Sequence, residues 1–384
     1  MRVLHTNFHL GWGGQAARVF ALCKGLRDLG VEAIVAAPKG SVLLKKCDAV
    51  GLRIFGDVHF SKGLRPLHFV HDVRALKRFM LANGIDILHT HGAQDTWSGT
   101  VADALCPKTA RPAVVRTRHN TFPVQFTLHN KLLYRRLIDR LIIVSDSVIQ
   151  QYSKFIESGI IHPENVTTIH SSIKVERFNP DLIGREEARA AFGIQQDVPV
   201  VVVAARLARE KGHKFLIEAM SSLIMEFPGL VLLIAGEGNQ EESLKAQTKA
   251  LNLSDNIRFI GFHEDVPRVL ATADVSVLPS IDCDASSATI KESMAMRVPI
   301  VATLIGGAAE IIDDGVDGLI VPPADAAALA TAIGRLLRDP ELRARMGEAG
   351  REKVIERFTE ERLARDTLEV YRSMMSARSD SADG

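Results

Sequence analysis

Two basic residues in the segment AARLAREKG are suited to binding a diphosphate. Arg206 offers a planar fork of donors, and Lys211 offers a compact charge on a flexible stem. They follow the apolar run VPVVVVAA, and residues after a parallel strand lie at the ligand-binding edge of an open α/β sheet. Both could therefore neutralise one leaving group that carries about two negative charges. A solvated charge cluster with Arg209 and Glu210 is the alternative interpretation.

The stretch SIDCDASSATIKES follows the apolar run VSVLP and combines small, hydroxylated and acidic residues. Ser286, Ser287 and Thr289 could cap a helix that begins near Thr289 and leave its free amides for a phosphate. Glu292, near the first turn, could accept hydrogen bonds from two ribose hydroxyls, and Asp284 could hold hydroxyls of a transferred sugar. Ordinary helix-start electrostatics would account for the same acidic residues.

Glycines and histidines follow apolar runs in the first half of the chain. Gly13 and Gly14 in GWGGQ could bring backbone amides to a phosphate or a sugar, although a simple turn has the same composition. His119 ends the run AVVRTRH, and a lone histidine is more often structural than catalytic. His89 and His91 end the run DILHTH, where we expect packing or acceptor contacts instead of catalysis.

The elements that must position these residues are short apolar runs that alternate with amphipathic segments. Apolar runs without polar alternation are typical of buried parallel strands, and GGQAARVFALCKGLRDLG has helical spacing with Gly30 as its stop. The runs are RVLHTNF, VEAIVAA, DILHTH, AVVRTRH, DRLIIVS and NVTTIH in the first half, and VPVVVVAA, GLVLLIAG, NIRFIGF, VSVLPS, VPIVAT and LIVP in the second. Their order predicts an α/β fold of two doubly wound, Rossmann-like domains.

The domain boundary is expected in SSIKVERFNPDL, where Asn179 and Pro180 interrupt any helix. The expected domains are residues 1–178 and 179–359, with a last helix over about 360–376 that packs back on the first domain. The small polar residues of 377–384 predict a disordered tail.

Composition sets the class of protein. A length of 384 residues suits two domains, and 46% hydrophobic with 24% charged residues excludes disordered and fibrous chains. The cysteines are far apart without metal-type spacing, so we expect reduced thiols, no metal site and a cytoplasmic location; they are Cys23, Cys47, Cys106 and Cys283. The sequence has no secretory pattern and no bilayer-length apolar run, which predicts a soluble protein.

Charge is divided unequally along the chain. Residues 1–180 contain 24 Lys and Arg against 13 Asp and Glu, a formal charge of +11, and the remainder has 23 against 33, or −10. The basic half is suited to a phosphorylated glycolipid or an anionic membrane surface, and mutual attraction of the two halves is the alternative. The basic segment HNKLLYRRLIDRLI fits either membrane contact or a helix that enters a strand. Nucleic acid is not expected as a partner, because no aromatic-basic platform accompanies the charge.

Along nearly its whole length, the chain resembles the glycosyltransferases of family 4, which have the two-domain GT-B fold. The resemblance rests on the order of many motifs: GG in the first loop, ERFNP, ARLAREKG, IAGEGN, IRFIGF, DVPRVLATADVSVLPS, ESMAMRVPIVAT and GGAAEIIDDGVDGLIV. It implies an active site in a cleft between the domains, with a nucleotide held mainly by the second domain and the acceptor by the first.

The resemblance also implies residue roles. Arg206 and Lys211 match the diphosphate-binding pair, Glu292 matches the ribose-binding acid, and His119 matches a histidine near the transferred sugar. Asp284 stands where the family usually has glutamate followed by glycine, which leaves the donor sugar open. Further donor contacts are implied for the first glycine loop, the turn after GLVLLIAG, the base-contacting IRFIGF and the helix start; these residues are Gly13, Gly14, Gly236, Glu237, Gly261, Phe262, Ser287, Thr289 and Ile290.

The reaction that the resemblance implies is retaining, metal-independent transfer of a sugar from a UDP-sugar, GDP-sugar or related donor. No cofactor is expected besides this donor substrate, and the acceptor is a glycan or a lipid-linked saccharide in polysaccharide or lipopolysaccharide synthesis. The expected location is the cytoplasm, and peripheral association with the inner face of the cytoplasmic membrane is the open alternative. Two alternatives remain: a nucleotide-sugar-binding protein without transfer activity, and a nucleotide-sugar epimerase of related fold.

Overall fold

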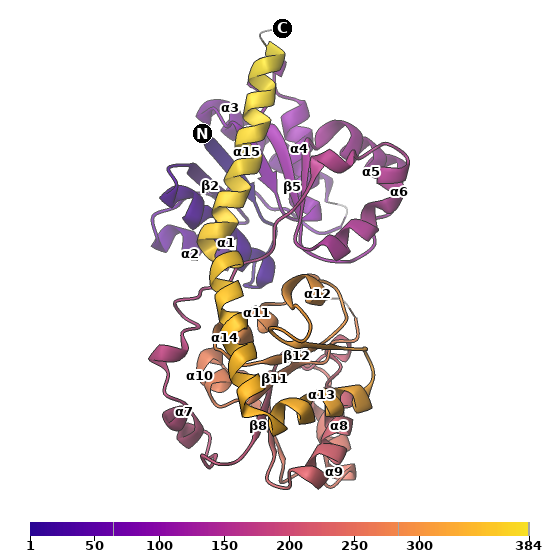
Figure 1. Cartoon of the computed structure of the whole chain (residues 1–384). Helices are drawn as coiled ribbons and strands as arrows, with labels where there is room; N and C mark the ends of the chain where they lie inside the picture. Colours follow the sequence, from indigo (N-terminus) through magenta and orange to yellow (C-terminus); the bar gives the residue numbers. More distant parts are fainter. Residues whose placement is uncertain (64, 283, 383–384) are drawn as a thin grey trace. The chain divides into compact units, whose positions relative to one another are not determined.

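A computed structural model describes residues 1–63, 65–282 and 284–382, and the chain forms two compact units (Figure 1). Unit 1 contains Met1–Ser172 and Glu360–Gly384, and unit 2 contains Ile173–Thr359. Ile173 pairs with Thr359 in an isolated bridge, and Phe178 is buried in the core of unit 2. The linker therefore joins unit 2 earlier than residue 179, the expected first residue of the second domain.

Unit 1 is built on a parallel sheet of order β3-β2-β1-β4-β5-β6-β7. The strands are β1 (Arg2–Thr6), β2 (Glu32–Ala36), β3 (Arg53–Phe55), β4 (Ile87–Thr90), β5 (Ala113–Arg118), β6 (Arg140–Ile143) and β7 (Val166–Thr168). The helices include α1 (Gly14–Asp28), α2 (Val42–Ala49), α3 (Pro66–Asn83), α4 (Ala93–Ala104), α5 (Leu128–Leu132), η2 (Leu133–Leu137), α6 (Ser153–Glu157) and α15 (Glu360–Ala382).

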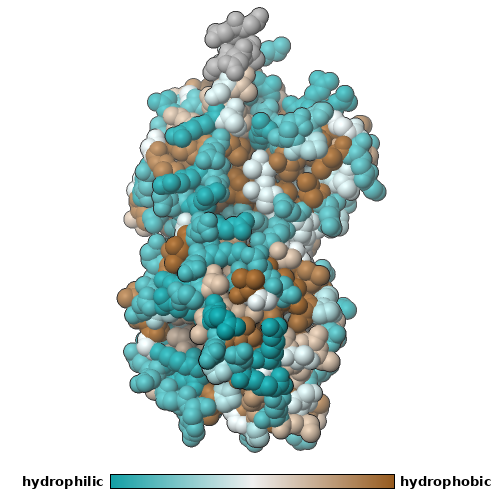
Figure 2. Space-filling model, in the orientation of Figure 1, coloured by the Kyte–Doolittle hydropathy of each residue, from teal (hydrophilic) through white to brown (hydrophobic). Residues whose placement is uncertain are grey.

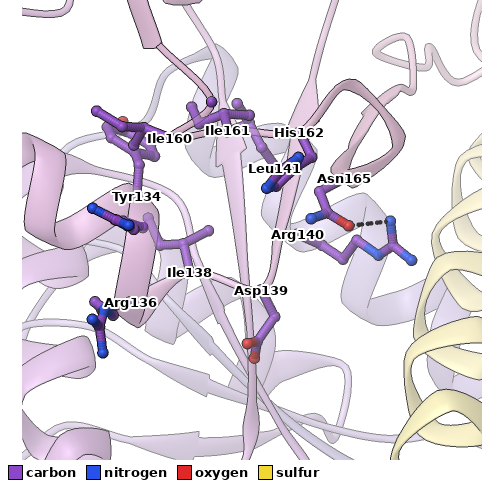
Figure 3. A pocket seen from close by; sticks show the side chains of 12 residues that line it. Tyr134, Arg136, Ile138, Asp139, Arg140, Leu141, Ile160, Ile161, His162 and Asn165 are labelled. Atoms are coloured by element: carbon purple, nitrogen blue, oxygen red, sulfur yellow. Dashed lines mark hydrogen bonds between the residues drawn. The ribbon is translucent and has the colours of Figure 1, made fainter. Parts of the chain in front are cut away.

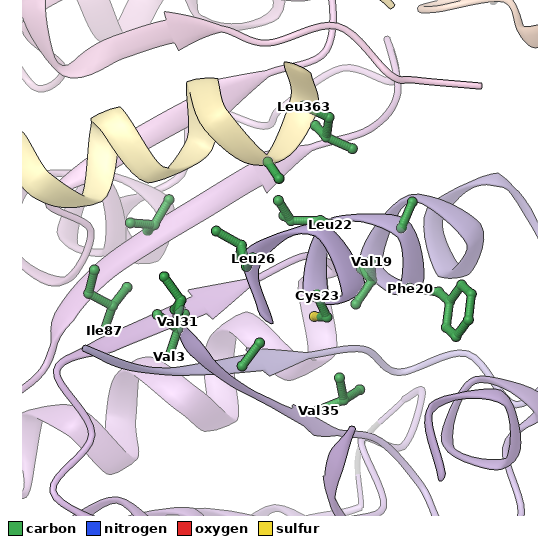
Figure 4. Packing of buried hydrophobic residues seen from close by; sticks show 14 of the residues in the cluster. Val3, Val19, Phe20, Leu22, Cys23, Leu26, Val31, Val35, Ile87 and Leu363 are labelled. Atoms are coloured by element: carbon green, nitrogen blue, oxygen red, sulfur yellow. The ribbon is translucent and has the colours of Figure 1, made fainter. Parts of the chain in front are cut away.

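Helices cover both faces of this sheet because successive strand residues point to opposite sides. Val3 and Val35 pack with α1, α2 and α15, whereas Leu4 and Ile34 pack with α3 and α4. Figure 4 shows Val19 and Cys23 of α1 turned toward the strands and Leu22 toward α15. The last helix thus completes the core of unit 1.

Unit 2 repeats the plan with a sheet of order β10-β9-β8-β11-β12-β13. Its strands are β8 (Val200–Ala204), β9 (Val231–Ala235), β10 (Ile257–Gly261), β11 (Val275–Leu278), β12 (Ile300–Thr303) and β13 (Leu319–Val321). Its helices include α7 (Arg185–Ala191), η6 (Arg209–Lys211), α8 (His213–Glu226), α9 (Glu241–Ala250), α10 (Val266–Ala271), α11 (Ala288–Ala295), α12 (Ala308–Ile311), α13 (Ala326–Arg338) and α14 (Pro340–Arg357). Val201 packs on one face and Val202 on the other, so the α/β, doubly wound prediction is confirmed for both units.

All twelve expected strands form, and β3 is an additional strand at the sheet edge. This strand has three residues, too few to show an alternating apolar pattern in the sequence, and they are largely exposed. The prediction of a disordered tail from residue 377 is wrong as far as Ala382, because α15 continues to that residue. Arg378 fastens this end by donating hydrogen bonds to the carbonyls of Arg111 (2.9 Å) and Pro112 (3.0 Å).

The basic segment 129–142 forms a helix that enters a strand, which confirms one of its two expected forms. It passes from α5 into the π-helical turn η2 and then into β6. Leu133 and Leu141 are buried, but Leu132 is exposed. Leu132 belongs to α5, none of whose residues is buried, so burial begins only in η2 at Leu133.

No helix within the described ranges is long and apolar enough to cross a membrane. Figure 2 shows a face on which hydrophilic residues predominate and hydrophobic ones form scattered patches. Cys23, Cys47 and Cys106 are free and buried, and Cys283 lies outside the described residues.

Candidate functional site

The strand order of unit 2 reverses between β8 and β11, which are neighbours in the sheet. Ligands of doubly wound folds bind at such a reversal, outside the carboxyl ends of the strands. The loop after β8 carries Arg206 and Lys211, and the loop after β11 carries Asp284. The backbone ties these loops together, because the amide of Ile281 donates to the carbonyl of Glu210 at 2.8 Å.

Lys211 and Asp284 form a direct ion pair, although they are far apart in the sequence. Lys211 Nζ lies 2.8 Å from Asp284 Oδ2, and the two side chains are only 17% and 12% exposed. Ser280 Oγ donates to the same carboxylate oxygen at 3.3 Å. The pair places a partly desolvated cation and a carboxylate acceptor at one point of the switch region.

Arg206 is placed differently from Lys211. Its guanidinium is 75% exposed and contacts Glu210 Oε1 at 3.0 Å. Such an exposed pair contributes little to stability and leaves the side chain free to reorient toward an anion. Arg206 and Lys211 therefore lie in the same loop, but only the Lys211 side chain is held in place by a partly buried ion pair.

Helix α11 begins beside this loop, and its start is organised by hydroxyl groups. Ser287 is the N-cap and accepts a hydrogen bond from the amide of Ile290 at 3.4 Å. Thr289 Oγ1 donates to the carbonyl of Ala204 at 2.9 Å, which anchors the helix to the end of β8. The side chain of Ile290 is buried in the core, so it contributes packing to this region.

Two residues of this helix have unusual charge environments. Burial raises the pKa of Glu292 to about 7, against the opposing effect of the cations Arg177 and Lys291. Lys291 is fully buried, and its Nζ donates to Ser286 Oγ at 3.0 Å. Glu292 is the fifth residue of α11 and therefore lies just beyond the first turn.

The turn after β9 meets the end of β10. The amide of Gly236 donates to the carbonyl of Gly261 at 2.8 Å, and the amide of Phe262 donates to Glu237 Oε1 at 3.4 Å. Gly236 has φ +144°, and a Cβ there would lie 2.1 Å from the carbonyl oxygen of Ala205. The four predicted donor residues in this region thus lie together, with the Phe262 ring 67% exposed.

Unit 1 has its own switch point between β1 and β4. Gly13 is the N-cap of α1, and a Cβ added at Gly13 or Gly14 would meet no described atom within 4 Å. The first amides of a helix have no intrahelical acceptor, so this open helix start offers donors to an anion. The geometry suits close approach of a ligand to the backbone.

His119 follows β5 and is joined to other histidines at the same edge. His119 Nε2 lies 3.1 Å from His91 Nδ1, and His91 Nε2 lies 3.2 Å from His5 Nδ1. His89 is separate from this series, because its Nδ1 lies 2.5 Å from Tyr371 Oη and its Nε2 lies 2.6 Å from Thr117 Oγ1. Burial lowers the pKa of His119 well below its usual value, and Arg18 adds to the effect.

The sequence interpretation missed three polar residues of these sites. Ser280 and Lys291 are buried beside Asp284 and Ser286, and His5 begins the histidine series. His5 lies inside an apolar strand and Lys291 inside an amphipathic helix, and no neighbouring sequence pattern marks either residue as part of a site. Only the strand order, which places β1 beside β4, could have linked His5 to His91.

A separate basic cavity of about 500 Å³ lies at the amino end of β6 (Figure 3). Its lining includes Arg135, Arg136, Arg140 and His162, and Arg140 Nη1 donates to Asn165 Oδ1 at 2.8 Å. Arg140 is the first residue of β6, whereas His119 follows the carboxyl end of the parallel strand β5. The basic cavity therefore belongs to the opposite edge of the sheet from His119.

Comparison with known proteins identifies the family. The family described as Glycosyltransferase Family 4 matches residues 12–177, and Glycosyl transferases group 1 matches residues 184–353. EpsD of Bacillus subtilis (strain 168), a protein assigned as a glycosyltransferase, is 32% identical over 320 residues, which cover 79% of this chain and 80% of EpsD. The chain belongs to glycosyltransferase family 4.

Other family relatives align over shorter stretches. The GDP-mannose-dependent alpha-(1-6)-phosphatidylinositol monomannoside mannosyltransferase of Mycolicibacterium smegmatis is 36% identical over 187 residues, covering 47% of this chain and 49% of that protein.

Solved structures show the fold of this glycosyltransferase. The glycosyltransferase of Rickettsia africae ESF-5 has a TM-score of 0.86 at 23% identity and covers 97% of this chain and 98% of its own. Anabaena Alr3699/HepE in complex with UDP-glucose has a TM-score of 0.78 at 21% identity, covering 97% and 100%. These likenesses over the whole chain confirm the GT-B prediction.

Proposed function

We propose that this glycosyltransferase moves a sugar, with retained anomeric configuration, from a nucleotide diphosphate sugar to a glycan or lipid-linked acceptor. The observation that carries the proposal is the Lys211–Asp284 ion pair at the switch point of unit 2. A diphosphate is bound by cations, and the hydroxyls of a hexose donate to oxygen acceptors. Lys211 supplies the cation and Asp284 supplies the acceptor, with 2.8 Å between Lys211 Nζ and Asp284 Oδ2. The bound UDP-glucose of the HepE structure is consistent with a donor of this class.

In the proposed reaction, the bond from the anomeric carbon to the β-phosphate oxygen breaks while the acceptor oxygen bonds to the same carbon. The acceptor's proton passes to the leaving diphosphate, so no protein nucleophile is required. Lys211, Arg206 and the amides at the start of α11 stabilise the developing negative charge, which is the role a metal ion would otherwise have. Glu292 holds ribose hydroxyls, and acceptor binding is assigned to unit 1.

The test is incubation of the full chain with UDP- and GDP-sugars, with and without a saccharide acceptor and with EDTA. We expect acceptor-dependent release of nucleotide and an EDTA-resistant product whose anomeric configuration, measured by NMR, matches the donor. Lys211→Ala should lower transfer at least a hundredfold, whereas Lys214→Ala in the same segment should not. Donor isomerisation without acceptor would identify an epimerase, and binding without turnover would identify a binding protein; either result contradicts the proposal.

We further propose that the basic cavity at the amino end of β6 contacts anionic lipid at the inner face of the cytoplasmic membrane. Arg135 and Arg136 are exposed there, and each cation near an anionic surface contributes roughly 1 kcal/mol. The relative that mannosylates phosphatidylinositol monomannoside acts on a lipid-linked acceptor. Cosedimentation should be stronger with phosphatidylglycerol than with phosphatidylcholine vesicles and should weaken in Arg135→Gln/Arg136→Gln; salt-independent or absent binding would refute this part.

A further inference from the structure

We propose that His5, His91 and His119 form a directional chain of neutral imidazoles that holds His119 as a hydrogen-bond donor through Nδ1. The chain has two links, His5 Nδ1 to His91 Nε2 at 3.2 Å and His91 Nδ1 to His119 Nε2 at 3.1 Å. Both distances are normal for nitrogen–nitrogen hydrogen bonds. The inference concerns unit 1 alone, and its functional consequence rests on the proposed transfer reaction.

The middle ring makes the chain directional. A neutral imidazole has one donor nitrogen and one acceptor nitrogen, and both nitrogens of His91 are engaged. His91 must therefore donate to one neighbour and accept from the other. The rings are neutral because burial lowers the pKa of His5 to about 3 and those of His91 and His119 well below their usual value.

The far end of the chain selects the direction. His5 Nε2 is buried, and it has no hydrogen-bond partner among the described residues. A buried N–H without an acceptor is rarer than an under-used acceptor, so the bare nitrogen of His5 is Nε2 and its proton is on Nδ1. His5 then donates to His91 Nε2, His91 donates from Nδ1 to His119 Nε2, and the proton of His119 must be on Nδ1.

The surroundings support neutral rings in fixed positions. The Oδ2 atom of the nearby buried Asp95 accepts from Thr6 Oγ1 at 2.6 Å and from the amides of His91 at 3.0 Å and Gly92 at 3.1 Å, and its buried Oδ1 has no hydrogen-bond partner among the described residues, the imidazoles included. It therefore anchors the backbone of His91 instead of pairing with an imidazolium. Arg18 adds a buried positive charge that further disfavours protonation of His91 and His119.

A metal site is the competing interpretation, because nitrogen atoms of His5, His89 and His91 lie within 4.8 Å of one another. The hydrogen bonds argue against it. Both nitrogens of His89 are engaged with Tyr371 and Thr117, and both nitrogens of His91 are engaged in the chain. A converging set of three ligands would have to break several of these bonds, whereas the chain uses them as they are.

This arrangement determines what His119 can do in the proposed reaction. Its lone pair on Nε2 is occupied by His91, so His119 cannot act as a general base through that nitrogen. Its Nδ1–H remains available to donate to an oxygen of a sugar. His5 and His91 are then positioning residues that fix the tautomer of His119, and the transfer step needs no protein base.

The direct test is ¹⁵N NMR of the ligand-free full chain labelled at histidine, between pH 6 and 8. We expect one neutral His119 tautomer, protonated at Nδ1, throughout this range. A proton on Nε2, a mixture of tautomers, or an imidazolium at pH 7 would overturn the proposal. This measurement needs neither donor nor acceptor, so it remains decisive even if the proposed reaction is wrong.

Variants separate the chain from simple packing. His91→Leu should release His119 into a mixture of tautomers and lower kcat roughly tenfold, while UDP binding to unit 2 and the donor KM stay within twofold. Thr117→Val removes a hydrogen bond of the neighbouring His89 with little change of volume and should leave the His119 tautomer unchanged. The imidazole chain would be contradicted if His119 became a mixture of tautomers in both variants. Stoichiometric Zn²⁺ binding that disappears in His91→Leu would also contradict it.

Discussion

Replacing Asp284 by asparagine should strengthen binding of UDP or GDP while it impairs transfer. In the free protein, Asp284 pairs with Lys211 at 2.8 Å and so competes with a diphosphate for that cation. Asparagine keeps the shape of the side chain but removes its charge. The freed Lys211 can then bind the diphosphate without a carboxylate nearby, whereas the hydroxyl-accepting carboxylate for the sugar is lost.

The geometry sets the size of the effect. A phosphate oxygen on the far side of Lys211 Nζ would lie twice 2.8 Å, about 5.6 Å, from the Asp284 oxygen. Two unit charges at that distance repel by ~3 kcal/mol at an effective dielectric constant of ~20 and by ~0.7 kcal/mol in water. Since both side chains are partly exposed, we expect a gain of about 1–2 kcal/mol, or roughly five- to thirtyfold in Kd.

The assay is isothermal titration calorimetry with UDP and GDP, combined with donor turnover. Asp282→Asn is the matched control, because Asp282 is an exposed carboxylate of the same loop, outside the Lys211–Asp284 ion pair. Lys211→Ala should weaken binding by about 2 kcal/mol, the opposite direction. Weaker nucleotide binding by Asp284→Asn, or an equal gain from Asp282→Asn, would refute the argument that this carboxylate competes with the diphosphate.

Three further results are expected. Nucleotide affinity should fall as pH drops below about 7, up to tenfold per unit, because protonation of Glu292 removes the negative charge that strengthens its hydrogen bonds from ribose hydroxyls. Glu292→Gln should be pH-independent in calorimetry, and a pH-independent wild type would exclude this role. The raised pKa of Glu292 also implies that the free energy of unfolding, measured with urea, declines as pH rises from about 4.5 to 7, because in this range Glu292 is protonated in the folded state and ionised in the unfolded state. An increase in the free energy of unfolding over this range would contradict the raised pKa. Gly306→Ala should lower the free energy of unfolding in urea by more than about 2 kcal/mol, because a Cβ there would lie 1.8 Å from the carbonyl oxygen of Asp284. Gly315→Ala is the control, since Gly315 has a similar positive φ but open space around it, and it should lower the free energy of unfolding by about 1 kcal/mol. Equal losses of stability in the two variants would disprove the clash.

The sequence determined the class of fold because it is encoded locally. Val200–Ala204 and Val231–Ala235 are continuous apolar runs, which suit strands of a sheet covered on both faces, and all twelve runs expected as strands form strands. Motif order identified the family for the same reason, since each motif is a short local pattern. The prediction from local sequence was wrong where a tertiary contact decides the structure. The end of α15 was expected to be disordered, but the hydrogen bonds of Arg378 hold it to unit 1.

The tertiary structure decided how the candidate residues are coupled. Lys211 and Asp284 were separate candidates until the pairing of β8 with β11 brought their loops together. Likewise, His5 and His91 became partners only because β1 lies beside β4, and burial then suppressed their charges. Residue types and spacing therefore specified which chemical groups are present, whereas strand order and desolvation set their partners, their protonation and the direction of their hydrogen bonds.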